Sequence, residues 1–540
     1  MNSTSLQDLP QWHSLIKCAE RISLPENHLK YLVESRDRLR RFSLKGGGIF
    51  LDFSRQRVDA ETMGLLFELA EARDLKNKFR KMMSGQIVNT TENRPALHTA
   101  CRDFSSRDIR VEGRNILPEI EEQRRLIKQF AGDVHSGKIK GSTGKRFTSV
   151  VVIGIGGSYL GTQFVSTALD AYADRGISIH YLANVDVHNF GDIIRRIDPE
   201  TTLWIIISKS YTTPETLANT NLAYHYMKSR GLDPSRHTVT VTAKGSPGDD
   251  PSNPVLASFN MFDYIGGRYS VSSAVGGVPL SLFLGYEVFE AFLYGAEEMD
   301  IHAAQAPVCE NLPLTAAMIS VWNNNFLHYP AQGIIPYASP LAKLAPHIQQ
   351  LTMESNGKSV GQDGAAVDVE TGTIIFGEPG TNAQHSFFQL AHQGRPFPID
   401  FIGVVNPQYD QFETLTKGVT NHQELWANLI SQPMALAKGK SDDNPAKCFS
   451  GNRPSSTILL NELSPADIGR LLSFYESKTV FEAFVWGINP FDQFGVELGK
   501  TMASDIRNAM AERNQDSRHG FDTADPISKY FLDTLFSGHL

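Results

Sequence analysis

One candidate for anion binding is the glycine-rich segment 154–158, whose sequence is GIGGS. It follows a predicted strand at 149–153 and precedes a helix predicted from about residue 160. Glycines at such a turn let the backbone approach an anion, and the helix N-terminus adds free N–H groups and a partial positive charge. The segment is not the dinucleotide fingerprint, because Tyr159 stands where the third glycine of GxGxxG would fall. This turn alone leaves two equal alternatives, an anion site and a merely tight turn.

A second polar turn follows the predicted strand at 203–207 and strengthens the case for an anion. Its residues, 208–213, read SKSYTT and all carry a hydroxyl or a positive charge. Thr213 is expected to be the N-cap of a helix with Pro214 at its first position, so the hydroxyls could also satisfy only the helix end. Two polar turns at the carboxyl ends of strands in one sheet would meet where ligands bind. A monophosphate is favoured over a nucleotide, since no adenine or ribose motif accompanies the pair.

Reacting groups must come from other segments, and four of these combine glycine turns with ionisable residues. They contain Arg268 (266–270), Glu354 (353–358), His385 (377–385) and Lys500 (491–500). Each residue also has a structural explanation: an ion pair for the arginine, a helix cap for the glutamate, a core position for the histidine and a solvated helix face for the lysine. Residue type and spacing alone leave both explanations open for each of them.

The elements that must position these groups follow an α/β rhythm. Short apolar runs at 149–153, 177–182, 203–207 and 238–242 alternate with helix-length segments, as in βαβ units with a parallel sheet. A second, less regular set of strand candidates lies at 333–337, 373–376 and 399–405, with helical patterns at 482–486 and 496–510. Residues 1 to about 115 are predicted to be mostly helical, for example over 61–83. The turn-rich run near 245–260 fits either a domain boundary or a surface loop.

Composition excludes several classes of protein. The 540 residues carry a formal net charge of −8, so neither nucleic acid nor a membrane surface is an expected partner, and any anion must be held locally. The four cysteines form no CxxC pair, so no metal site, redox cofactor or disulfide framework is expected. The apolar stretches 269–286 and 311–342 are too rich in glycine, serine, proline and asparagine to span a membrane. The first residues lack the features of an export signal, so a cytoplasmic location is expected.

Several motifs together resemble the glucose-6-phosphate isomerase family. DYIGGRYSVSSAVG at 263–276 and FDQFGVELGK at 491–500 look like the two signatures of that family. The segments GIGGS, SKSYTT, MESNGK and GTNAQHSFFQLAHQG resemble it as well, in the same chain order. The similarity covers about 150 to 500, whereas residues 1 to about 115 contribute little to it. Ser210, where many relatives have threonine, and Tyr159, where aspartate is common, are small departures from the pattern.

The resemblance implies an α/β fold of two sugar-isomerase (SIS) type, doubly wound parallel-sheet domains, and a homodimer. It implies a helical N-terminal region (1–115) packed on the larger domain, a smaller SIS-type domain (116–285), a larger one (286–512) and a C-terminal tail (513–540). The implied reaction is the reversible interconversion of glucose 6-phosphate and fructose 6-phosphate without a cofactor or metal.

The resemblance also implies a role for each matched residue. Glu354 would be the base, Arg268 would stabilise the enediolate, and His385, supplied by the neighbouring subunit, would assist ring opening together with Lys500. The substrate-binding set would be Gly157, Ser158, Ser208, Lys209 (through its backbone), Ser210, Thr213, Gln350, Gln493 and Glu215, the last of these supporting the histidine. These types suit the chemistry, because removing a sugar C–H proton needs a placed carboxylate and a cation near the oxygen that gains charge.

Two alternatives stay open at this point. A non-catalytic sugar-phosphate sensor would need the phosphate turns but has no evident need for Glu354, Arg268, His385 and Lys500 together. An isomerase that also accepts mannose 6-phosphate would use the same residues.

Overall fold

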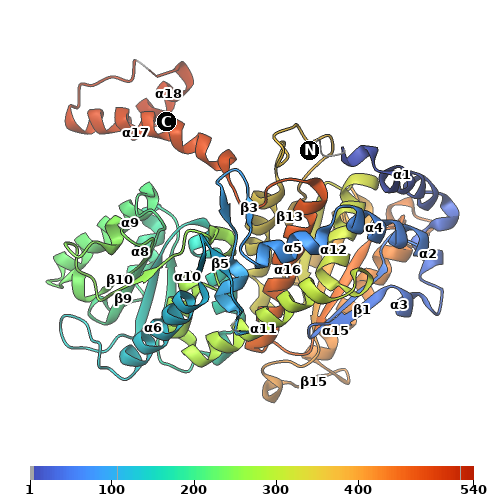
Figure 1. The fold of residues 1–540 in the computed structure, drawn as a ribbon, viewed down its shortest axis with the longest axis horizontal. Helices are drawn as coiled ribbons and strands as arrows, with labels where there is room; N and C mark the ends of the chain where they lie inside the picture. The colour runs from blue at the N-terminus through green and yellow to red at the C-terminus, as the bar shows by residue number, and fades with distance from the viewer. Residues whose placement is uncertain (1–4, 106, 523) are drawn as a thin grey trace. The chain divides into compact units, whose positions relative to one another are not determined.

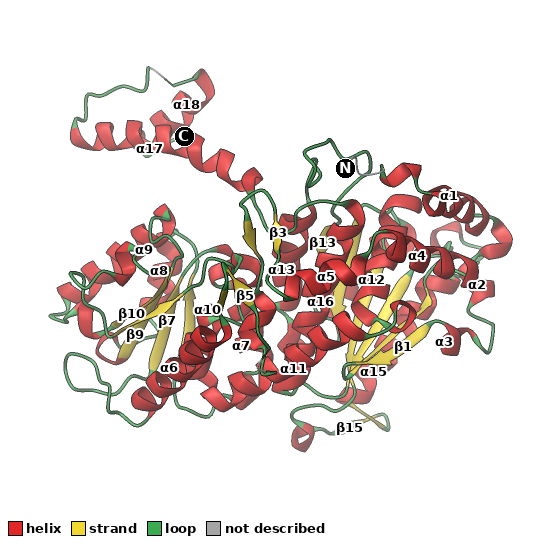
Figure 2. Cartoon of the chain, viewed as in Figure 1, coloured by secondary structure: helices red, strands yellow, loops and turns green. Residues whose placement is uncertain are grey.

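The computed structural model describes residues 5–105, 107–522 and 524–540, which form two units, Met1–Phe491 and Asp492–Leu540. The first unit contains two sheets with helices around them (Figures 1 and 2). This mixed α/β architecture with parallel strands confirms the predicted fold class.

The smaller sheet is entirely parallel and has five strands in the order β11-β10-β9-β7-β8. Its strands are β7 (Ser149–Ile153), β8 (Ser178–Leu182), β9 (Thr202–Ile207), β10 (Thr238–Thr242) and β11 (Ala257–Asn260). The four strands predicted here are confirmed, and β11 was not predicted. The run near 245–260 therefore enters the edge strand of this sheet after a short loop.

Alternate residues of the central strands bury against opposite layers of helices, as the two-residue period of a strand requires. Val151 and Ile153 pack with α8 (Val187–Ile194) and α9 (Pro214–Ser229). Val150 and Val152 belong to the larger core on the other face, which includes α6 (Leu117–His135), α7 (Leu160–Ala168) and α10 (Ala274–Leu284). Burial on both faces explains why these strands are continuous apolar runs.

The strand order reverses direction at β7, and this brings the two polar turns together. From β7 the chain first adds β8 on one side and then β9 on the other, with Ile153 opposite Ile206. The turns after β7 and β9 therefore leave the same edge of the sheet from neighbouring strands. This is the position at which doubly wound sheets bind ligands.

The larger sheet has six strands in the order β1-β2-β17-β14-β12-β13. The parallel part consists of β12 (Ala331–Pro336), β13 (Ile374–Phe376), β14 (Ile399–Val404) and β17 (Ser455–Leu460). The three predicted strands are confirmed, while β17 was not predicted. One face packs on α14 (Phe388–Gln393) and α15 (Asn421–Lys438), and the other packs on α12 (Leu312–Val321) and α16 (Pro465–Trp486).

The N-terminal region contains strands that were not predicted. Strands β1 (Ser43–Gly46) and β2 (Ile49–Arg55) form an antiparallel pair, and β2 adds antiparallel to β17 at the edge of the larger sheet. Ile49, Leu51 and Phe53 alternate along β2 and are buried, a two-residue period that the helical prediction overlooked. Two short hairpins follow, β3 (Ile87–Asn89) with β4 (Arg94–Pro95), and β5 (Arg110–Val111) with β6 (Arg114–Asn115).

The helices of the N-terminal region occur where apolar residues have helical spacing. They are α1 (Pro10–Ile22), α2 (Leu29–Leu32), α3 (Arg38–Arg41), α4 (Ala60–Ala72) and α5 (Leu75–Met83). The predicted helix 61–83 is thus two helices, because Asp74 adopts a left-handed conformation (φ 54°) between them. The remaining helices named in the figures are α11 (Tyr286–Gln305) and α13 (Leu344–Gln349).

The packing partners of the helices change near Gly285. Helix α10, before it, packs on α6 and α7, whereas α11, after it, packs along α16. These contacts support our proposal that one α/β domain covers 116–285 and a second begins at 286.

The second unit begins at Asp492, before the predicted start of the tail at residue 513. It contains α17 (Phe494–Gln515) and α18 (Pro526–Ser537). Arg513 Nη1 donates a hydrogen bond to the carbonyl of His519 (2.8 Å), and the rings of Phe521 and Phe536 pack at a tilt of 48° with their centroids 5.3 Å apart. These contacts hold the two helices of this unit together.

Candidate active site

The glycine turn after β7 lies directly against the segment that carries Arg268. Residues Gly156–Ser158 form a 3₁₀ turn, η4, which contacts a second one, η9 (Gly267–Tyr269). A Cβ atom added to Gly157 would lie 2.2 Å from the carbonyl carbon of Gly267, so only glycine fits there. Gly156 has a positive φ of 58°, and a Cβ on it would lie 3.1 Å from Nε2 of Gln350. The structure thus brings Gly157 and Ser158 beside Arg268 and Gln350.

The turn after β9 presents hydroxyl groups at the start of α9. Ser208 is buried, its Oγ accepts a hydrogen bond from the amide of Tyr211 (3.1 Å), and it lies 3.4 Å from Oγ1 of Thr213. Ser210 is exposed and bonds to Oγ1 of Thr212 (2.7 Å). Thr213 occupies the predicted N-cap position, but its side chain makes no capping bond to any described residue. The amide groups at the start of this helix remain available to an anion.

The side chain of Lys209 is directed away from this turn. Its Nζ donates to the carbonyl oxygen of Asp263 (2.8 Å) and lies 3.5 Å from Oδ1 of the same residue. Burial lowers the pKa of Lys209, and the nearby positive charge of Arg94 lowers it further. The ammonium group is therefore already engaged, which supports binding of an anion through the backbone of Lys209.

The buried pair Arg268 and Glu354 is the chemical centre of the site. Arg268 is only 3% exposed, and its Nη1 lies 3.6 Å from Oε1 of Glu354, whose side chain is 20% exposed. The second carboxylate oxygen, Oε2, is buried and accepts no hydrogen bond from the described residues. One oxygen thus faces the guanidinium while the other remains available to act as a base.

A π-helical turn, η13 (Gln350–Glu354), carries both the carboxylate and Gln350. It continues α13 without a break and contacts η9, the turn of Arg268. Such turns are rare and are frequent at functional sites. The side-chain oxygen of Gln350 is also buried without a partner among the described residues. The site therefore keeps two unused acceptors side by side on one turn.

Four further residues hold this pair in place and were not assigned from the sequence. Nε of Arg268 lies 2.6 Å from Oγ of the fully buried Ser355, and Nη2 donates to the carbonyl of Pro490 (2.5 Å). Nζ of Lys358 donates to the carbonyls of Glu354 (3.1 Å), Ser355 (2.9 Å) and Asn489 (3.0 Å). Ser355 and Lys358 lie in the MESNGK motif, so their proximity in sequence to the carboxylate was the available signal. Nothing in the local sequence indicated Asn489 and Pro490.

The structure does not join His385 to Glu215 within one chain. His385 ends a 3₁₀ turn, η14 (Asn382–His385), is exposed, and makes no hydrogen bond or ion pair with another described residue. Glu215 lies in the first turn of α9, and its buried Oε2 has no partner among the described residues. Both groups are thus left with unused hydrogen-bonding capacity.

Gln493 and Lys500 belong to the second unit. Gln493 is the N-cap of α17, and Lys500 lies in the second turn of that helix, exposed. The two residues belong to one element, because α17 is a continuous helix over Phe494–Gln515 and Gln493 caps its start.

Among the residues that the structure describes, no group of three or more His, Cys, Asp and Glu side chains is arranged to hold a metal ion. None of the described helices combines the length and apolar character needed to cross a membrane.

The fold and the site define an α/β protein with two polar turns at one sheet edge beside a buried arginine that faces a partly exposed carboxylate. The sequence model of the family described as phosphoglucose isomerase matches residues 52–527. The chain is 62% identical over 539 residues to a glucose-6-phosphate isomerase of Desulfosudis oleivorans, covering 99% of both chains. It is 43% identical to a cytosolic glucose-6-phosphate isomerase of Oryza sativa subsp. japonica, covering 98% and 97% of the two chains.

A solved structure agrees with these relatives. The crystal structure of a glucose-6-phosphate isomerase from Chlamydia trachomatis superimposes with a TM-score of 0.89 at 37% identity, covering 99% of this chain and 100% of the other. The chain belongs to the phosphoglucose isomerase family, and the predicted resemblance is confirmed.

Proposed function

We propose that this chain catalyses the reversible isomerisation of glucose 6-phosphate and fructose 6-phosphate. Family membership gives the reaction, and one geometric observation supports it in this chain: Glu354 faces Arg268 with one oxygen and leaves the other unpaired. An aldose–ketose isomerisation moves one proton from C2 to C1, so it needs one base that can take and return a proton.

The phosphate group binds at the edge of the smaller sheet. Ser158, Ser208, Ser210 and Thr213 contribute hydroxyls, and the backbone of Gly157 and Lys209 contributes N–H groups at the starts of helices. Neutral donors and helix dipoles suit a dianion on a protein whose net charge is −8. The remote phosphate then fixes C1 and C2 near Glu354, which is how binding energy assists a proton transfer.

Glu354 removes the C2 proton of the open-chain aldose, and the electron pair of that C–H bond becomes the C1–C2 double bond. The carbonyl oxygen gains the negative charge of the enediolate, and the guanidinium of Arg268 stabilises that charge. Return of the carbon-bound proton to C1, with transfer of the C2 hydroxyl proton to the C1 oxygen, gives the ketose. By the resemblance in sequence, the role of orienting the sugar hydroxyls is assigned to Gln350 and Gln493.

Ring opening precedes this step and is assigned to His385 and Lys500. An imidazole titrates near neutral pH and can exchange a proton between the ring oxygen and the anomeric hydroxyl. In the proposed homodimer the partner subunit's His385 completes the site, oriented by Glu215. The exposed, unpaired His385 and the unpaired Oε2 of Glu215 support this arrangement. We place the reaction in the cytoplasm, in line with the rice relative named cytosolic.

A non-catalytic sugar-phosphate sensor is less well supported than the isomerase. Such a protein has no evident need of an arginine that is 3% exposed and lies 3.6 Å from a carboxylate with one unpaired oxygen. Acceptance of mannose 6-phosphate as a further substrate is compatible with the same residues.

The function is tested by a coupled assay of fructose 6-phosphate conversion to glucose 6-phosphate. Wild type is expected to be active, and Glu354→Gln is expected to lose at least about 10³-fold in kcat, because it keeps the shape but removes the base. Binding of inorganic phosphate, measured by calorimetry, should be unchanged in the variant. Unchanged turnover would remove Glu354 as the base, and an inactive wild type would favour the sensor.

The shared site is tested by mixing two inactive variants, Glu354→Gln and His385→Ala. In a mixed dimer, one site combines an intact Glu354 with an intact His385 of the partner chain, so activity should return after subunit exchange. Sedimentation gives the oligomeric state. A fully active monomer, or no recovery in a mixture shown to exchange subunits, would contradict the shared histidine.

A further inference from the structure

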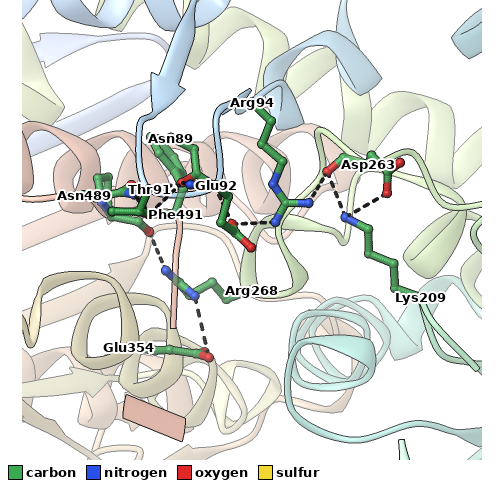
Figure 3. A network of polar contacts seen from close by, with 11 residues as sticks. Asn89, Thr91, Glu92, Arg94, Lys209, Asp263, Arg268, Glu354, Asn489 and Phe491 are labelled. Carbon is green, nitrogen blue, oxygen red and sulfur yellow. Dashed lines mark hydrogen bonds and ion pairs between the residues drawn. The ribbon is translucent and has the colours of Figure 1, made fainter. Parts of the chain in front are cut away.

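The hairpin β3–β4 of the N-terminal region lies in a chain of polar contacts that runs from Lys209 to Glu354 (Figure 3). The resemblance in sequence gave this region no role. Asn89 and Thr91 bond to Asn489, Arg94 bonds to Asp263, and Glu92 bonds to both Asn89 and Arg94. The two ends of the hairpin support different segments of the first unit.

At one end, the hairpin holds the backbone that supports Arg268. Nδ2 of the buried Asn489 donates to Oδ1 of Asn89 (2.8 Å) and to Oγ1 of Thr91 (2.7 Å). The next residue, Pro490, provides the carbonyl that accepts from Nη2 of Arg268 (2.5 Å). A shift of Asn489 would therefore move the acceptor that orients the guanidinium opposite Glu354.

At the other end, the hairpin holds the backbone that supports Lys209. Nη1 of Arg94 and Nζ of Lys209 both donate to the carbonyl oxygen of Asp263, each at 2.8 Å. Two cations on one acceptor repel each other, so this arrangement needs a negative charge nearby. Two carboxylates supply it: Oδ1 of Asp263 lies 3.5 Å from Nζ of Lys209, and Oε2 of Glu92 lies 2.6 Å from Nη2 of Arg94.

Glu92 also joins the two ends. The same oxygen that pairs with Arg94 accepts a hydrogen bond from Nδ2 of Asn89 (2.6 Å). A charge-assisted pair of this kind is shorter and stronger than a neutral hydrogen bond, and bonds that share one atom polarise each other. The side chains of Arg94 and Glu92 are 27% and 26% exposed, so solvent screens the pair only in part.

We propose that the β3–β4 hairpin is a positioning strap that couples the phosphate turn to the base, with Arg94 acting on Lys209 and with Asn89 and Thr91 acting through Asn489 on Arg268. This inference rests on the proposed function. None of these four hairpin residues is a catalytic residue, since each acts through another group. The coupling is useful because phosphate binding at Lys209 would then favour the arrangement in which Arg268 and Glu354 face the sugar carbons.

The first test separates the two ends by steady-state kinetics with fructose 6-phosphate. Thr91→Val keeps the shape and removes the hydroxyl, so kcat should fall about tenfold with KM and the affinity for inorganic phosphate nearly unchanged. Thr91→Ser should restore kcat, which a merely structural role of the methyl group would not produce. Arg94→Met should lower the affinity for inorganic phosphate, measured by calorimetry, by about tenfold, and it should also lower kcat.

The second test measures the coupling directly with the double variant Thr91→Val/Arg94→Met. If the strap couples the two sides, the loss in kcat/KM should be clearly smaller than the product of the single losses. Glu92→Gln provides the same test without removing the arginine, in case Arg94→Met fails to fold. Arg110→Met in the neighbouring β5–β6 hairpin is the control, since the hydrogen bonds of its side chain to described residues go to Asp108 and Gly113, nearby in the chain.

The outcomes distinguish the strap from the proposed function itself. The coupling would be overturned if the single variants had wild-type kinetics. It would also be overturned if the loss in kcat/KM of the double variant equalled the product of the single losses. Neither result would contradict the isomerase activity. An inactive wild type that still binds inorganic phosphate would instead contradict the proposed function. A parallel loss of activity in Arg110→Met would assign the effect to general destabilisation and so also overturn the strap.

Discussion

The proposed phosphate side and the proposed base side of the site consist of different kinds of chemical groups. On the phosphate side, the turns after β7 and β9 offer neutral hydroxyls and backbone amides at the edge of the smaller sheet. On the base side, the groups are charged, buried and fixed by several contacts each, as shown by Arg268 with Ser355 and Pro490. The two sides meet where η4 contacts η9.

This difference matches what each side must do. A dianion brings its own charge, so the protein needs only donors that can approach it, and glycine at Gly157 permits that approach. A proton transfer depends on the distance and orientation of the base, so its side chains must be held from several directions. Substitutions should therefore change kcat on the base side and KM on the phosphate side.

Among the further substitutions that test this comparison, the largest effect is expected for Arg268→Lys. Lysine keeps the positive charge but lacks the planar fork that reaches Ser355, Pro490 and Glu354 together. We expect kcat to fall about 10²–10³-fold, or about 3–4 kcal/mol, with KM changed little. Steady-state kinetics on wild type, this variant and the exposed control Arg236→Lys gives the answer. A loss confined to KM would show that Arg268 belongs to the binding side.

The next effect concerns the buried charges beneath the base side. Arg102 is fully buried between two carboxylates, with Nε and Nη2 on Asp300 (2.6 and 2.8 Å) and Nη1 on Glu476 (2.6 Å). Nη1 also donates to Oγ of Ser272 (3.0 Å), four residues after Arg268. One cation between two carboxylates leaves an excess negative charge, and burial raises the pKa of Glu476 to about 7.

This raised pKa makes stability depend on pH in a defined direction. The folded protein holds the Glu476 proton more tightly than the unfolded chain, so this contribution is complete below pH 4.5 and is lost as pH rises through about 7. The free energy of unfolding of wild type should fall between pH 5 and pH 8, and Glu476→Gln should reduce that fall by about 1–3 kcal/mol. Chemical denaturation at the two pH values measures both.

The comparison with wild type isolates Glu476 from other titrating groups. Asp400, whose pKa burial raises to about 6, contributes equally to both proteins and cancels in the difference. Identical pH dependence in wild type and variant would mean that Glu476 is ionised throughout this range.

The smallest effect is expected on the phosphate side, for Ser208→Ala. This change removes one neutral hydroxyl that also accepts from the amide of Tyr211, while the other donors of the turn remain. We expect KM to rise about tenfold, or about 1.4 kcal/mol, with kcat nearly unchanged. Ser229→Ala, at the exposed far end of α9, is the matched control. A drop in kcat at constant KM would break the proposed division between the two sides.

Much of the fold could be predicted from the sequence, and the roles of the site residues stay predictions. Strands such as 149–153 were visible because burial on both faces makes them continuous apolar runs with turn residues after them. Strand β2 was overlooked because its alternation lies in a region whose other apolar residues have helical spacing. The helix break at Asp74 was not predicted either, because a single aspartate in the left-handed conformation does not disturb the helical spacing of the apolar residues around it.

The sequence by itself determined which chemistry this protein can perform: the residue types for a phosphate turn, a carboxylate base and its cation are all present within short motifs. Only the tertiary structure decided how those motifs are held. Arg268 donates to the backbone carbonyl of Pro490, and Lys209 donates to that of Asp263. Every residue type has a backbone carbonyl, so the sequence cannot reveal these bonds. The hairpin that links those carbonyls joins segments up to about 400 residues apart, a closeness that arises from packing and not from any local pattern.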